Sequence, residues 1–186
     1  MAFLLRLWLP ILLSAVFVFV ASSVIHMALK WHNPEYRGLP NEDQVREAIN
    51  AGKPVPGQYV VPYCMDHKDL GKPEMVKKFK DGPVALMWLR APGPVEMGGT
   101  LVGWFLFTLV VSFFVAYLAA HTLAPGTHYL QVFRVVGTVA LLAYAAGSTP
   151  NSIWMGKPWS STFKDMLDGL IYALLTAGTF GWLWPK

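Results

Sequence analysis

The stretch TLVGWFLFTLVVSFFVAYLAAHT, residues 100–122, contains no Asp, Glu, Lys or Arg and decides the fold class. A helix of about 20 predominantly apolar residues is long enough to cross the hydrocarbon core of a bilayer. Three more runs are predominantly apolar over about this length, at Trp8–Leu29, Tyr129–Gly147 and Lys164–Trp184. The sequence therefore predicts four transmembrane helices.

The composition leads to the same class. Hydrophobic residues make up 54% of the 186 residues and charged residues only 14%, whereas a soluble domain is about a quarter charged. Ten basic and nine acidic residues lie between positions 30 and 98. This excludes a soluble globular fold, and an aromatic content of 14% excludes a disordered chain. We expect an all-α membrane protein with a small mixed α/β loop domain between helices 1 and 2. Its parts are residues 1–29, 30–98 and 99–186.

The water-facing segment 30–98 has its own local signals. Asn41 as an N-cap, with Gln44 three residues later, predicts a helix that stops at Gly52. A second helix is expected from Pro73 to Lys80. Val84–Leu89 has strand propensity and is expected to pair with Tyr59–Val61. Because so small a segment has little core of its own, we expect it to pack on the helix ends as a cap.

Four crossings place both termini on one side of the membrane and segment 30–98 on the other. Arg6 and Lys186 flank the helices on the side of the termini, with Arg134 one turn inside. The loop side carries more basic residues near helix ends: Lys30, Arg37, Arg46, Lys80, Arg90, Lys157 and Lys164. The positive-inside rule then predicts a cytoplasmic loop and outward-facing termini.

Small residues recur every four positions in two of the runs, which favours close helix packing in lipid. The last run contains Gly169, Ala173, Ala177 and Gly181, and the second contains Thr108, Ser112, Ala116 and Ala120. Two interpretations remain open: packing within one chain, or an interface with another copy or another membrane subunit.

Ionisable groups near the membrane interior are candidate functional residues. His26 lies about one turn from the end of the first run, and Asp165 and Asp168 lie in the first turns of the fourth. A pair formed by His26 and Asp168 can relay a proton or bind a cation. The alternative is structural, because acidic residues in a first turn stabilise a helix N-terminus.

Cofactor signals are weak. His26 and His121 invite a haem or pigment interpretation, but they lie near opposite membrane faces and cannot ligate one iron. Cys64, Met65 and His67 resemble soft-metal ligands without a second group nearby, and we predict no metal site. No phosphate-binding glycine loop is present, and nothing points to nucleic acid. Bound membrane lipid is the expected ligand.

Two segments carry a resemblance. Asn151-Ser152-Ile153-Trp154-Met155-Gly156-Lys157-Pro158-Trp159, followed by a Gly/Ala-rich final helix, resembles small bacterial four-helix membrane proteins of unknown function. The first helix and its exit Lys30-Trp31-His32-Asn33-Pro34-Glu35-Tyr36 are similar to theirs. The resemblance covers about half of the chain. It implies their architecture and a bacterial inner-membrane setting, and it implies no catalytic residues.

These observations favour a non-enzymatic accessory or scaffold subunit of a larger inner-membrane complex. Its partners would be lipids and other membrane subunits, or further copies of itself. The alternative is a small homo-oligomeric ion or proton transporter or channel that uses His26 and Asp168. A membrane enzyme ranks third, because no catalytic set is recognisable.

Overall fold

The computed structural model describes residues 2–186, with side chains from Leu5 onward. The chain divides into two compact units. The first comprises the residues up to Arg37 together with Glu96–Lys186, and the second is Gly38–Val95. The exit segment Lys30–Arg37, expected in the loop domain, thus belongs to the helical unit.

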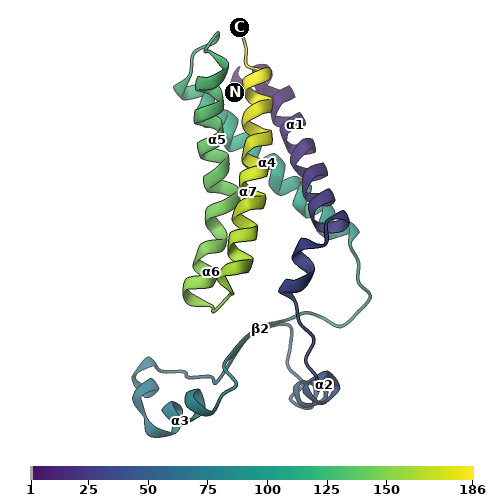
Figure 1. Ribbon diagram of the computed structural model, residues 1–186, viewed down its shortest axis with the longest axis vertical. Coiled ribbons are helices and arrows are strands. Elements are labelled where there is room, and N and C mark those ends of the chain that lie inside the picture. Colours follow the sequence, from purple (N-terminus) through teal and green to yellow (C-terminus); the bar gives the residue numbers. More distant parts are fainter. Residues whose placement is uncertain (1) are drawn as a thin grey trace. The chain divides into compact units, whose positions relative to one another are not determined.

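The first unit is a helical bundle (Figure 1). Helices α5 and α7 lie side by side along most of their length, and α1 packs against both α4 and α7. The chain begins and ends at the same end of this bundle. The α-helices of the unit are α1 (Ala2–Ser23), α4 (Gly98–Thr122), α5 (Tyr129–Ala145), α6 (Thr149–Trp154) and α7 (Trp159–Trp182).

Two irregular turns follow α1. A π-helical turn, Val24–Ala28, extends it, Leu29 is extended, and a 3₁₀-helix covers Lys30–Glu35. A further 3₁₀ turn, Ala146–Ser148, joins α5 to α6. The first predicted run therefore ends in a π turn and an extended residue, Leu29.

Three helical stretches are long and apolar enough to cross a membrane: Leu5–Ala28, Gly98–Thr122 and Tyr129–Trp154. The first three predicted runs lie within or overlap these stretches. Helix α7, with 24 residues, is long enough, but its first half contains Lys164, Asp165 and Asp168, and it is not among the helices apolar enough to cross a membrane, so the fourth span is not confirmed.

Helix α4 shows which surface faces outward. Its exposed side chains Val102, Leu106, Val110 and Phe114 recur every four residues and form one apolar stripe. The opposite face is buried and includes Thr108 and Ser112 alongside alanine and valine. An apolar outside and a partly polar inside are the pattern of a helix surrounded by lipid.

The bundle core is built largely from small and β-branched residues. One cluster includes Val115, Val132, Val136, Ala140 and Ala177. A second lies around Val18, Ile25 and Tyr172. Ser14 Oγ donates to Ser112 Oγ over 3.0 Å and so joins α1 to α4 inside the core.

The second unit follows its local signals. Its helices are α2 (Glu42–Ala51) and α3 (Pro73–Asp81), with a short 3₁₀-helix at His67–Gly71. Strands β1 (Gly57–Val61) and β2 (Ala85–Leu89) pair antiparallel, with Tyr59 opposite Met87. The two predicted helices and the predicted strand pairing are confirmed. Pro62 is the one buried residue among the described side chains of this unit.

Candidate functional site

The structure brings the predicted polar pair together. His26 Nε2 lies 3.7 Å from Asp168 Oδ2. The Asp168 side chain is only 5% exposed, whereas that of His26 is 53% exposed. A carboxylate so buried inside a helical bundle needs partners, because burial of an unpaired charge is costly.

Asp168 lies deeper in its helix than expected. Its helix was expected to begin near Lys164, which would place Asp168 in the first turns. Instead α7 begins at Trp159, directly after Pro158 at its N-cap. At 1.5 Å per residue, Asp168 is about 13 Å into the helix. Compensation of orphan N–H groups at a helix N-terminus therefore does not explain its position.

The irregular end of α1 creates the rest of the site. A π turn places His26 at its centre, and Leu29 then breaks the helix. The 3₁₀-helix that follows presents His32 and Glu35, three residues apart, on one side. His32 Nε2 lies 2.9 Å from Asp168 Oδ2, and His32 Nδ1 lies 2.8 Å from Glu35 Oε1.

Sequence reasoning missed His32. It was interpreted as part of the polar end of a membrane helix, and its contact with Asp168 spans 136 positions. The usable signal was the presence of two histidines within seven residues at the helix end predicted to face Asp168. In the structure the rings of His26 and His32 stack, with centroids 4.7 Å apart and planes at 10°.

Lysines surround this cluster. Lys164 Nζ donates to the Trp31 carbonyl at 2.5 Å and lies 3.3 Å from Glu35 Oε1. Lys157 forms an ion pair with the predicted residue Asp165. Asp165 is thus held at the edge of the cluster, with one oxygen close to ligand atoms of His32 and Glu35.

A groove of about 470 Å³ opens beside the cluster. Met27, Met97 and Leu101 form part of its apolar wall, and His26 and Asp168 lie at its polar part. Nearby, Trp104 Nε1 donates to Ser22 Oγ over 2.7 Å, joining α4 to α1. Among the described residues, the buried hydroxyls of Tyr144 and Tyr172 and Asp168 Oδ1 have no hydrogen-bond partner.

The other predicted candidates lie elsewhere. His121 is exposed in the last turn of α4, with Nδ1 2.6 Å from the Tyr117 carbonyl oxygen. It is 17 residues, or about 25 Å of helix, from Trp104, which contacts the end of α1. Cys64 is in the second unit, where its Sγ donates to the Asp66 carbonyl at 3.1 Å.

The small-residue stripe of α7 lies against α5. A Cβ added at Gly169 would meet Ala145 at 2.8 Å, and one at Gly181 would meet the Tyr129 ring at 2.7 Å. Ala173 and Ala177 are buried between them. On α4, Thr108, Ser112 and Ala116 are fully buried, and the fourth member, Ala120, packs partly against the same core.

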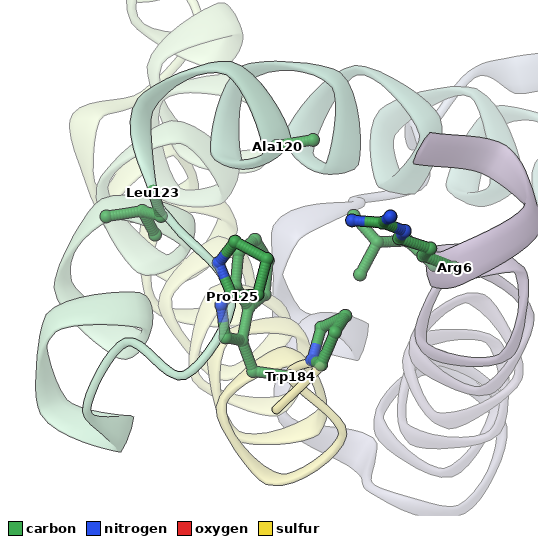
Figure 2. Close-up of a pocket in the computed structure, with 7 residues that line it drawn as sticks. Arg6, Ala120, Leu123, Pro125 and Trp184 are labelled. Atoms are coloured by element: carbon green, nitrogen blue, oxygen red, sulfur yellow. The ribbon is translucent and has the colours of Figure 1, made fainter. Parts of the chain in front are cut away.

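A second cavity, of about 250 Å³, lies at the end of the bundle where the chain begins and ends. Figure 2 shows Arg6 from α1 facing Pro125 and Trp184, with Ala120 from the last turns of α4 and Leu123 just after it around them. Among the described residues that line this cavity, Arg6 is the one charged residue. The groove beside Asp168, which is lined by His26, Asp165 and Asp168, therefore has more ionisable side chains and is the better candidate site.

Comparisons with known proteins do not assign the chain to a family. No protein-family model, no curated protein and no solved structure matches this chain. The resemblance to small bacterial four-helix membrane proteins stays a prediction.

Proposed function

We propose that the chain is a four-span protein of a bacterial inner membrane and serves as a non-enzymatic accessory subunit of a larger membrane complex. Segment 38–95 would then lie in the cytoplasm and both termini outside, as the distribution of basic residues predicts.

The proposal that α7 is the fourth span rests on its length and on where its charges lie. Its 24 residues correspond to about 36 Å of helix, more than the roughly 30 Å hydrocarbon core. Lys164 and Asp165 form ion pairs within the bundle, and Asp168 lies 2.9 Å from His32. From Gly169 to Trp182 the helix has no charged side chain. Paired charges at one end are compatible with a membrane helix.

The observation that carries the subunit proposal is that the unit Gly38–Val95 has almost no buried core and exposes large apolar side chains. This unit has two amphipathic helices and a two-stranded antiparallel sheet but a single buried residue among its described side chains. Large apolar groups such as Val55, Tyr63, Met65 and Trp88 are exposed, Met65 to 88%. Exposed apolar groups of this kind indicate a surface for another protein.

The charge of the segment supports the same proposal. Its basic and acidic residues are nearly balanced. A balanced surface favours neither nucleic acid nor an anionic membrane surface, both of which select basic segments. We therefore infer that the companion is a protein, which would cover the apolar side chains of this unit.

Cross-linked native membranes test this proposal. The chain should co-purify with at least one companion in stoichiometric amount. The triple variant Tyr63→Ser, Met65→Ser and Trp88→Ser should lose the companion while the bundle remains folded. A matched variant that replaces exposed polar groups of the same unit, Glu47→Ser and Lys53→Ser, should retain it. Purification at the mass of the single chain, without a companion, would refute the proposal.

An ion or proton transporter remains the second candidate, favoured by the 3.7 Å approach of His26 to the buried Asp168. In this case, reconstituted vesicles should show an ion or proton flux that Asp168→Asn abolishes at unchanged protein content. Absence of flux under every tested gradient would eliminate this candidate.

A further inference from the structure

We propose that His26, His32 and Asp168 form a binding site for one divalent transition-metal ion, with Zn²⁺ as the best-fitting class. The three side chains come from separate pieces of the bundle: the π turn after α1, the 3₁₀-helix and the middle of α7. Their ligand atoms all lie within 4.8 Å of one another. The inference does not depend on the proposed role as a subunit.

The hydrogen bonds on the far side of each ring determine which nitrogen faces Asp168. His26 Nδ1 lies 3.1 Å from the Ser22 carbonyl oxygen, and a carbonyl can only accept. His32 Nδ1 lies 2.8 Å from Glu35 Oε1, which accepts when ionised. Both Nδ1 atoms therefore carry the proton. In the neutral rings both Nε2 atoms then present lone pairs toward the carboxylate.

Three electron-pair donors consequently converge on one small volume. Two imidazole lone pairs and Asp168 Oδ2 repel one another unless a proton or a metal cation lies between them. Asp168 Oδ1 is buried without a hydrogen-bond partner among the residues described, so this carboxylate has an oxygen to spare. A buried carboxylate that faces two imidazole nitrogens, one of them half exposed, offers the donor set of a cation site.

The spacing fits a metal with short bonds. Zinc binds imidazole nitrogen and carboxylate oxygen at about 2.0–2.2 Å, which puts neighbouring ligand atoms of a tetrahedral site about 3.4 Å apart. The distances from Asp168 Oδ2 are 2.9 Å to His32 Nε2 and 3.7 Å to His26 Nε2. The ideal separation lies between these values, and the stacked rings, whose planes are 10° apart, would have to tilt toward one another for both lone pairs to reach one ion.

The second contact of each histidine ring is of the kind found around metal sites. Metal-bound histidines usually donate their second N–H to a carboxylate or a backbone carbonyl, which orients the ring. Here His32 has the carboxylate of Glu35 and His26 has the carbonyl of Ser22. Lys164, 3.3 Å from Glu35, offsets the second negative charge.

The site has three protein ligands and an open side. His26 is half exposed, and it lines the groove together with Asp168. Three ligands plus an accessible position allow a water molecule or another small ligand to complete the coordination. Imidazole and carboxylate donors suit zinc and neighbouring first-row metals better than calcium or magnesium.

Metal titration of the full chain tests the site. The protein is purified in nanodiscs with a tag that lacks histidine, stripped with a chelator and titrated with Co²⁺, then with Zn²⁺. We expect one Co²⁺ per chain, visible absorption bands typical of a low-coordinate cobalt site, and displacement by one Zn²⁺. A purely structural histidine–aspartate pair would give no such spectrum.

Variants assign the ligands. His26→Gln should weaken Co²⁺ binding by at least about 100-fold, because loss of an outer-shell partner alone costs about 10–100-fold. It should fold normally, because within the described part of the chain the hydrogen bond of its ring runs to Ser22, four residues earlier. Asp168→Asn should have the same effect on binding, and Glu35→Gln should weaken it about 10–100-fold while one ion still binds.

His67→Gln, an exposed histidine of the second unit, is the matched control and should bind as the wild type does. Three results would overturn the proposal. They are no stoichiometric metal on the wild-type chain, wild-type affinity in His26→Gln, and loss of binding in His67→Gln. The last result would place the metal near Cys64 instead.

Discussion

Replacement of Gly169 by alanine tests how α5 and α7 pack. A Cβ at this position would lie 2.8 Å from the backbone N and Cα of Ala145 as well as from its Cβ. Backbone atoms cannot rotate away, so the two helices must separate until the contact approaches the 3.4 Å of ordinary van der Waals distance. Overpacking of this kind costs about 1–3 kcal/mol.

Gly178→Ala is the matched control on the same helix. Its Cβ would meet only the Tyr129 hydroxyl, at 3.9 Å, which is an ordinary contact. Both substitutions gain helix propensity, up to about 1 kcal/mol. This gain cancels when the two variants are compared. Gly169→Ala should therefore be less stable than Gly178→Ala by about 1–3 kcal/mol, the cost of the close contact alone.

Reversible unfolding in mixed detergent micelles, followed by circular dichroism, measures this difference in the free energy of unfolding. In a thermal scan each kcal/mol corresponds to about 2–4 °C for a chain of this size. Size-exclusion chromatography of both variants checks the oligomeric state. Equal stabilities, or a Gly169→Ala variant that is folded but altered only in oligomeric state, would refute packing of the small-residue stripe within one chain.

Two further predictions concern the orientation and the polar core. Cys64 is the single cysteine, so a membrane-impermeant maleimide should label the chain only after the cells are permeabilised; labelling of intact cells would reverse the proposed orientation. Ser112→Ala removes the acceptor of the 3.0 Å bond from Ser14. Hydrogen bonds between membrane helices average about 0.6 kcal/mol, so the same unfolding assay should show a loss below about 1 kcal/mol. A loss well above this value would mean that Ser112 supports more than one helix contact.

The sequence predicted the elements whose signals are local. Apolar runs located the first three bundle helices, and Asn41, Gly52 and Pro73 marked the helices of the second unit close to their observed ends. The start of α7 was missed because the predicted run began at the charged residue Lys164, whereas the helix begins at Trp159, directly after Pro158. Hydropathy locates the part of a helix that can lie in the membrane, whereas the backbone determines where the helix begins and ends.

The candidate site was predictable only in part. Similar depth on one side of the membrane sufficed to pair His26 with Asp168. His32 required knowledge of the π turn and of the break at Leu29, which place it on a separate 3₁₀-helix. Contacts distant in the sequence accompany these turns, here those of Lys164 with Trp31 and of His32 with Asp168, and local propensity does not reveal them.

The position of Asp168 bears on both proposals. A helix that only packed against α5 would gain from an apolar residue there, because buried ion pairs replaced by well-packed apolar groups are often neutral or stabilising by about 1–4 kcal/mol. The neighbouring Gly169 already provides the close approach to Ala145. Packing therefore accounts for Gly169 and not for Asp168. Two rings face this carboxylate, and their outer nitrogens already contact acceptors, so their inner nitrogens and Asp168 are together available for a cation, as the proposed metal site requires.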